Sequence, residues 1–187
     1  MVYAATLARL LACALWLTLP LSAFATPDAK APDSSPQSAA TSAYLHPASN
    51  RWIGGRLSEA ELPRLDAMGI RHVISMAPDS ETPELDEAAL LAGFGIRQHT
   101  LPVSEPSHLT RLNAERLDTL LAAVGEDNTL LHCASGNRVG ALIAVRAAWM
   151  EGLDTEAALA KGKAWGLTRW EPEVRALLAT EAITTAQ

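Results

Sequence analysis

The sequence predicts an α/β fold, with a mostly parallel central sheet flanked by helices on both faces. Strand-like apolar segments alternate with helical segments along the chain, an order that is typical of parallel sheets. A glycine-bearing segment, His-Cys-Ala-Ser-Gly-Asn-Arg at residues 132–138, joins a short apolar strand to an apolar, alanine-rich helix. We expect a ligand at this loop, because parallel sheets bind ligands at the carboxyl ends of their strands.

Apolar spacing and turn residues predict the individual elements. Ser58 with Glu61 forms a capping box, and Gly69 ends the helix that follows. Pro83, after Thr82, suits the first turn of another helix. The predicted strands are residues 52–53 (a short edge strand), 70–76, 96–103 and 129–132. The predicted helices are residues 58–69, 82–93 or 82–95, 107–124, 139–150, 154–164 and 172–182.

The first 25 residues resemble a secretory signal. Arg9 precedes an apolar run at 10–19, and Ala23-Phe24-Ala25 fits a small-x-small cleavage site. The run is shorter than the ~20 residues that a membrane span needs, so we predict cleavage after Ala25, export to the periplasm and no membrane insertion afterwards. We predict that residues 26–43 form a flexible linker, because they have too few large apolar side chains to join a core. The predicted domain is 44–182, followed by a tail at 183–187.

Charge and cysteine content exclude several classes of function. Loss of Arg9 with the signal changes the formal net charge from −6 to −7, which disfavours binding to nucleic acid. Cleavage also removes Cys13 and leaves Cys133 without a disulfide partner. A lone thiol in an oxidising compartment favours a functional role over that of a small buried apolar residue. The five histidines are scattered, and no Walker-type loop is present, so we predict neither a metal nor a cofactor.

The 132–138 loop has the composition of an anion-binding site with a nucleophile. The first N–H groups of a helix lack carbonyl partners, and the helix dipole is positive at that end. Arg138 adds two parallel donors that match phosphate or sulfate oxygens. The same field favours the thiolate form of Cys133. A surface ion pair for Arg138 and a simple turn at Gly136 are the alternatives, which the shared spacing with Cys133 disfavours.

The motif resembles the signature loop of cysteine-dependent protein tyrosine and dual-specificity phosphatases. That signature most often has five residues between its cysteine and arginine, whereas this chain has four, the loop length of many rhodanese-type sulfurtransferases. The segment is more similar to the loop of the bacterial beta-lactamase-hydrolase-like phosphatase domains. Flanking segments at 54–58, 69–74 and 101–103 extend the resemblance from Trp52 to about Leu167. The resemblance implies a three-layer phosphatase-like fold.

The resemblance also implies roles for the loop residues. Cys133 would attack phosphorus and form a phosphocysteine, which water then hydrolyses. Arg138 and the backbone amides of Ala134, Ser135, Gly136 and Asn137 would bind the phosphoryl oxygens. His132 would order the loop without transferring a proton, because adjacent residues on a strand point to opposite faces.

The proton donor for the leaving group departs from the family pattern. The family uses an aspartate in the loop that here reads Val-Ser-Glu-Pro-Ser-His at 103–108. Glu105 is the nearest replacement, with His108 and Asp79 as further candidates; a solvated carboxylate is the alternative for Glu105. Val139 stands where the family often has a hydroxyl residue, a role that Ser135 could fill.

Three functions remain open. The first is a phosphatase acting on a phosphorylated protein or small molecule. The second is sulfur transfer through a Cys133 persulfide, which needs no general acid and fits the four-residue gap. The third is a catalytically silent anion-binding module that would keep Arg138 and the loop amides. Trp165 is a candidate for the pocket wall.

Overall fold

A sheet of five strands is the centre of the computed structural model, which describes residues 44–185. The strand order is β1-β2-β5-β3-β4, and only the β1–β2 pair is antiparallel. The strands are β1 (Leu45–Ala48), β2 (Arg51–Gly54), β3 (His72–Ser75), β4 (Arg97–Thr100) and β5 (Thr129–His132). The predicted signal peptide and linker lie outside the described residues.

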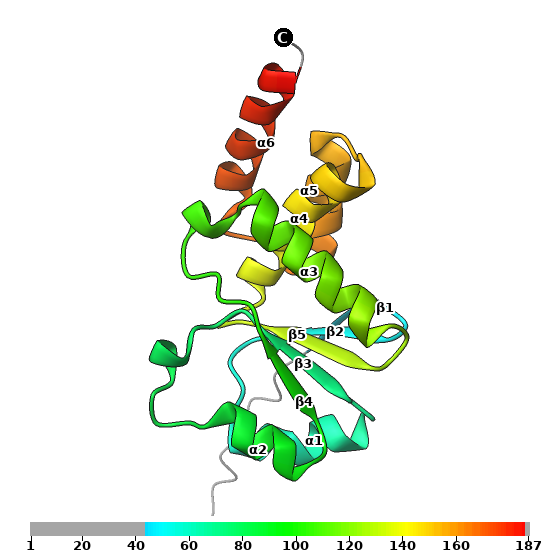
Figure 1. Ribbon diagram of the computed structural model, residues 1–187, viewed down its shortest axis with the longest axis vertical. Coiled ribbons are helices and arrows are strands. Elements are labelled where there is room, and N and C mark those ends of the chain that lie inside the picture. The colour runs from blue at the N-terminus through cyan, green and yellow to red at the C-terminus, as the bar shows by residue number, and fades with distance from the viewer. Residues whose placement is uncertain (1–43, 186–187) are drawn as a thin grey trace, which may run out of the picture. The chain divides into compact units, whose positions relative to one another are not determined.

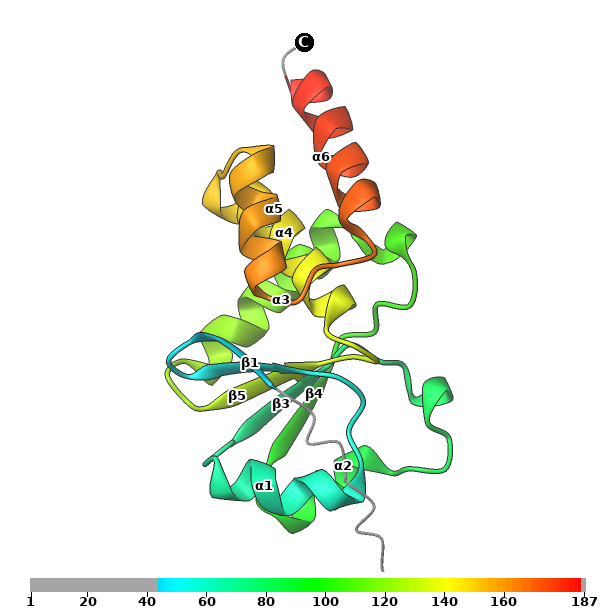
Figure 2. The same cartoon turned by 180° about the vertical axis from the view of Figure 1, so that it is seen from behind.

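Helices cover both faces of the sheet, as the sequence predicts. The longer helices α3, α4, α5 and α6 lie over one face, and α1 and α2 lie under the other (Figures 1 and 2). Their bounds are α1 (Leu62–Ala67), α2 (Glu87–Gly93), α3 (Arg111–Val124), α4 (Asn137–Glu151), α5 (Thr155–Ala164) and α6 (Glu171–Thr185). Three single turns of 3-10 helix are η1 (Glu59–Glu61), η2 (Asp79–Glu81) and η3 (Pro106–His108). Among the described residues, no helix is long and apolar enough to span a membrane.

Each face of the sheet has its own apolar core. The larger core, on the side of α3–α6, contains Cys133 and most of α4, as expected for a helix that is apolar nearly all round. The smaller core joins α1 and α2 to the opposite face, with Leu65, Ile70 and Leu91 fully buried. This two-sided burial explains the apolar centres of β3 and β5, whereas β4, at the edge of the sheet, is polar.

A strand is present at Trp52 and Ile53, but the prediction that it lies at the edge of the sheet is wrong. These residues belong to β2, which lies between β1 and β5. The edge is β1, which the sequence analysis missed because Pro47 interrupts it. A proline has no N–H to donate, so it fits an edge strand, and Ser49 and Asn50 allow the tight antiparallel connection.

Two predicted helix starts are also wrong. Thr82-Pro83 precedes α2 without joining it, and the helix is capped instead by Asp86, whose side chain accepts a hydrogen bond from Ala89 N–H. Residues 107–124 divide into the turn η3 and the helix α3, which Thr110 caps. The capping box at Ser58 is confirmed. At the end of the chain, α6 extends to Thr185, past the predicted boundary at 182.

The carboxyl ends of the four parallel strands meet at one edge of the sheet. Gly55, after β2, pairs with Ser135, after β5. Met76, after β3, donates its N–H to the carbonyl of His132, and Val103, after β4, donates its N–H to Met76. The segment after β2 therefore pairs with the Cys133 loop, the segment after β3 binds the end of β5, and the segment after β4 binds the one after β3.

Candidate active site

The loop between β5 and α4 brings the sulfur of Cys133 against the start of a helix. The Cys133 side chain is fully buried, whereas Ala134 and Ser135 are exposed. Gly136 has a φ of 82°, which other residues adopt only with strain. This turn lets its N–H donate a hydrogen bond to Cys133 Sγ over 3.1 Å. The backbone therefore directs a donor at the sulfur, which stabilises negative charge there.

The side chain of Arg138 points into the interior of the protein, on the same side of the sheet as Cys133. Its side chain is 9% exposed, and its Nη1 and Nη2 donate to the two carboxylate oxygens of Glu81 over 2.6 and 2.7 Å. Nη1 also donates to the carbonyl of Val103 over 3.1 Å. A guanidinium has five N–H groups, so Nε and one N–H of Nη2 remain along a single edge. That edge matches two oxygens of a tetrahedral anion.

The ion pair with Glu81 sets the protonation of both groups. The hydrogen bond that Arg138 donates to Glu81 raises the pKa of Arg138, burial opposes this, and the interaction with Cys133 raises it further. The hydrogen bond from Arg138 lowers the pKa of Glu81, although partial burial opposes the shift. Glu81 is thus held as a carboxylate and is a poor proton donor near neutral pH.

A cavity of about 470 Å³ opens beside the loop. Loop residues Ala134, Ser135, Asn137 and Arg138 form one side of its wall, and the rest of the wall consists of Glu81, Ser104, Arg169, Trp170 and Glu173. Two arginines and two glutamates thus face the same space. None of the five residues of the second group was predicted from the sequence as part of the site. A signal was present for Glu81 and Ser104, since they follow β3 and β4 at the carboxyl edge of the sheet.

His132 points to the opposite side of the sheet from Cys133, as strand alternation predicts. Its Nε2 lies 2.9 Å from Glu87 Oε1, which also accepts a hydrogen bond from Gln98 Nε2 over 2.8 Å. The imidazole is 1% exposed, and its Nδ1 has no hydrogen-bond partner among the described residues. His132 and Cys133 therefore do not form a catalytic pair.

The predicted proton donors do not line the cavity. The Glu105 side chain is 64% exposed and accepts a hydrogen bond from Ser107 Oγ. His108 accepts a hydrogen bond at Nδ1 from the N–H of Ser104, which does line the cavity. Trp165 is half-buried and packs against the larger core, and it is Trp170 that forms part of the cavity wall. Val139 is fully buried, and its side chain has no hydroxyl to offer the sulfur.

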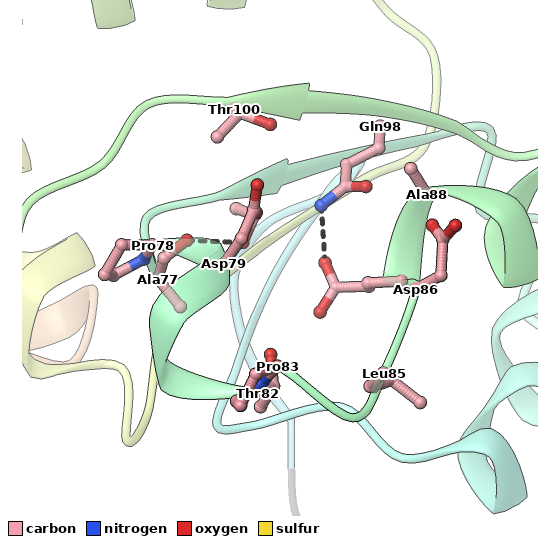
Figure 3. Close-up of a pocket in the computed structure, with 12 residues that line it drawn as sticks. Ala77, Pro78, Asp79, Thr82, Pro83, Leu85, Asp86, Ala88, Gln98 and Thr100 are labelled. Carbon is pink, nitrogen blue, oxygen red and sulfur yellow. Dashed lines mark hydrogen bonds between the residues drawn. The ribbon is translucent and has the colours of Figure 1, made fainter.

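A second cavity, of about 350 Å³, lies at the carboxyl ends of β3 and β4 (Figure 3). Asp79 lines it, together with Asp86, Glu87 and Gln98, and no residue of the Cys133 loop does. Figure 3 shows the hydrogen bond from Gln98 to the glutamate. No group of three or more potential metal ligands occurs within residues 44–185.

A mostly parallel sheet, with a cysteine and an arginine in a loop between its central strand and a buried helix, defines the protein tyrosine and dual-specificity phosphatase fold. The chain is similar to several solved structures of that fold. One is a presumed phosphatase from Neisseria meningitidis, which is 22% identical with a TM-score of 0.57 and covers 70% of this chain and 94% of that chain.

Two further solved structures are similar to the chain in fold. PTPMT1 in complex with PI(5)P is 17% identical with a TM-score of 0.53, over 77% of this chain and 99% of that chain. Kinase associated phosphatase, with its catalytic-site cysteine replaced by serine, is 15% identical with a TM-score of 0.53, over 73% and 88% of the two chains. No protein-family model and no curated protein matches the chain. The structural likeness establishes the fold.

Proposed function

We propose that this chain is a cysteine-dependent phosphatase that hydrolyses phosphate monoesters. The observation that carries the proposal is the geometry around one sulfur: Cys133 Sγ accepts the N–H of Gly136, and Arg138 is held inward with one edge of its guanidinium available. The fold is shared with phosphatases, among them one whose catalytic-site cysteine is named. The resemblance of the loop to the beta-lactamase-hydrolase-like domains supports the same reaction.

The chemical steps follow from these groups. The Cys133 thiolate attacks phosphorus, an S–P bond forms, and the ester P–O bond breaks with its electron pair going to the leaving oxygen. The available edge of Arg138 and the loop amides of residues 134–137 stabilise the charge on the phosphoryl oxygens in the transition state. Water then attacks phosphorus, the S–P bond breaks, and the thiolate and inorganic phosphate are released.

The leaving oxygen needs a proton. Glu81 is unsuited because its ion pair with Arg138 lowers its pKa. Glu105 remains the predicted donor, and it would have to turn from Ser107 towards the cavity. Glu173 is a second candidate, since its carboxylate already lines the cavity. Glu105→Gln and Glu173→Gln, compared on an alkyl phosphate, separate them: loss of the proton donor lowers kcat by about 10²-fold.

One assay tests the proposal. The purified protein and its Cys133→Ser variant are compared for phosphate release from p-nitrophenyl phosphate, with and without vanadate. We expect release that vanadate inhibits and that the variant lacks, since serine is mostly protonated at neutral pH. Equal release by the two proteins, or none by either, would overturn the proposal.

Sulfur transfer is the second candidate, because four residues separate Cys133 from Arg138 and the predicted acid Glu105 is exposed. In that reaction the Cys133 thiolate takes a sulfane sulfur from thiosulfate, releasing sulfite, and passes it to cyanide as thiocyanate. The same two proteins, assayed with thiosulfate and cyanide, distinguish it. Retained phosphate binding without either product would indicate the silent module.

We also propose export to the periplasm through a signal peptide at residues 1–25, followed by the 26–43 linker. The arginine, apolar run and small residues before position 26 support it. Expression of the full chain in a bacterial host tests the proposal. The periplasmic fraction should contain a protein that begins at Thr26, as determined by mass spectrometry.

A further inference from the structure

The connection between α5 and α6 packs directly on the Cys133 loop. Gly166 has a φ of 96°, and a Cβ atom at this position would lie 3.0 Å from the carbonyl oxygen of Gly136. Only a glycine allows this approach without displacing the loop. The connection and the nucleophile loop are therefore in backbone contact, although about thirty residues separate them in the sequence.

Asn137 fixes the same connection through its side chain. Its Oδ1 accepts three hydrogen bonds, from Thr168 N–H over 2.9 Å, Thr168 Oγ1 over 3.1 Å and Trp170 N–H over 3.2 Å. Asn137 is 2% exposed and is the first residue of α4, one position before Arg138. The backbone on both sides of Arg169 is thus tied to the loop that binds the anion.

The backbone at Arg169 is held in place, and the charge of its side chain has no partner in the described part of the chain. Its side chain lines the cavity with Arg138 but forms no hydrogen bond or ion pair with the residues that the structure describes. Arg138, by contrast, is neutralised by the bidentate contact with Glu81. Arg169 is exposed at the cavity mouth, where a cation attracts an anionic part of a ligand that the loop has already bound.

We infer that Arg169 is a second anion-binding group, and that the preferred substrate is a small phosphate ester with a further anionic group beside the phosphoryl group that is transferred. This inference rests on the proposed function. Trp170 adds a flat apolar surface next to Arg169, suited to the carbon skeleton between the two anionic groups. Glu173, on the same wall and also without a partner in the described part of the chain, repels an anion that is displaced from Arg169.

Binding to a non-reacting protein tests the inference. In the Cys133→Ser background, calorimetry compares α,ω-alkanediol bisphosphates of increasing chain length with the corresponding monophosphates. We expect the best bisphosphate to bind about tenfold more tightly than its monophosphate. Arg169→Gln should reduce this ratio to about two, the value expected for two equivalent ends, and leave monophosphate binding within about twofold.

Two further variants sharpen the comparison. Arg71→Gln removes an exposed arginine at the amino end of β3, away from the cavity, and should leave the tenfold ratio unchanged. Glu173→Gln should increase it. A bisphosphate-to-monophosphate affinity ratio of about two or less in the protein that retains Arg169 overturns the inference, even if p-nitrophenyl phosphate is hydrolysed. Absence of that hydrolysis overturns the proposed function itself, so the two failures are distinguishable.

Discussion

Residues 81–87 bind His132 and Arg138, the two functional neighbours of Cys133, from opposite faces of the sheet. Glu81, in η2, binds Arg138 on the cavity side of the sheet. Glu87, at the start of α2, binds His132 on the other side. Arg138 retains N–H groups that its partners do not use, whereas the buried imidazole of His132 lines neither of the two cavities. We therefore expect the reaction to take place on the Arg138 side, and we expect the contacts on the His132 side to stabilise the loop.

The cavities on the two sides differ in the same sense. The cavity beside the 132–138 loop is lined by Arg138 and Arg169 as well as two glutamates, while Cys133 lies buried behind its wall. The cavity in Figure 3 has three carboxylates, Asp79, Asp86 and Glu87, and no cation among its lining residues. A phosphorylated ligand is attracted to the first cavity and repelled by the second.

Substitution of Arg138 should break this asymmetry most severely. Arg138→Lys keeps the charge but loses the parallel donors that can hold Glu81 and an anion together. We expect kcat for p-nitrophenyl phosphate to fall by about 10³-fold, the effect of removing a donor from an oxyanion site. Circular dichroism should show an unchanged fold. Retention of a tenth or more of the activity would mean that Arg138 does not stabilise the transition state.

Substitution of Glu81 should have a smaller effect on the same side. Glu81→Gln can still accept one hydrogen bond from Arg138 but no longer holds both of its terminal nitrogens in one orientation. We expect kcat/KM to fall by about tenfold and the free energy of unfolding by about 1–3 kcal/mol. Glu84→Gln, a change of another carboxylate in the same segment, is the control and should alter neither quantity. A rise in kcat/KM would instead identify Glu81 as an internal competitor of the substrate.

The same pair predicts a dependence of stability on pH. Arg138 holds the pKa of Glu81 below its ordinary value of 4.5, so the carboxylate contributes stability that is complete above that value. The contribution is lost as the pH falls through the lowered folded-state pKa. Thermal unfolding should show a constant difference between wild type and Glu81→Gln from about pH 7 to about pH 5, and a shrinking one below. A difference that grows on acidification would contradict this origin.

The pattern of strands and helices was predictable because buried elements consist mainly of apolar residues. Residues 129–132 and 139–150 are apolar where both faces of an element are covered, and the structure has β5 and α4 there. The start of α2 was not predictable in the same way. Thr82-Pro83 has the local chemistry of a helix start, but the chain continues past it to Asp86. Asp86 caps the helix, and Glu87 next to it contacts His132 and Gln98, which are distant in the sequence.

The loop at Cys133 was predictable because its residues are adjacent in the sequence. Arg169 and Glu173 were not, because they are distant from the loop in the sequence and reach the cavity only through the fold, and Glu81 was indicated only by its place after β3. Even Asn137, which the sequence assigns to phosphate binding through its backbone, has a side chain that holds residues 168–170. A single sequence shows which groups are reactive but not which groups surround them.

The smallest effect is expected on the His132 side. In Glu87→Gln the amide oxygen can replace Oε1, which accepts from both His132 and Gln98, while the amide nitrogen takes the place of Oε2. Because both hydrogen bonds survive, kcat should stay within about threefold and the free energy of unfolding should fall by less than about 1 kcal/mol. Glu87→Ala removes the acceptor and leaves a buried ring nitrogen without a partner, so stability should fall by about 1–3 kcal/mol. If Glu87→Gln lowers kcat/KM by about tenfold, as expected for Glu81→Gln, the charge of Glu87 acts on Cys133 through His132, and the two sides of the loop are not separate.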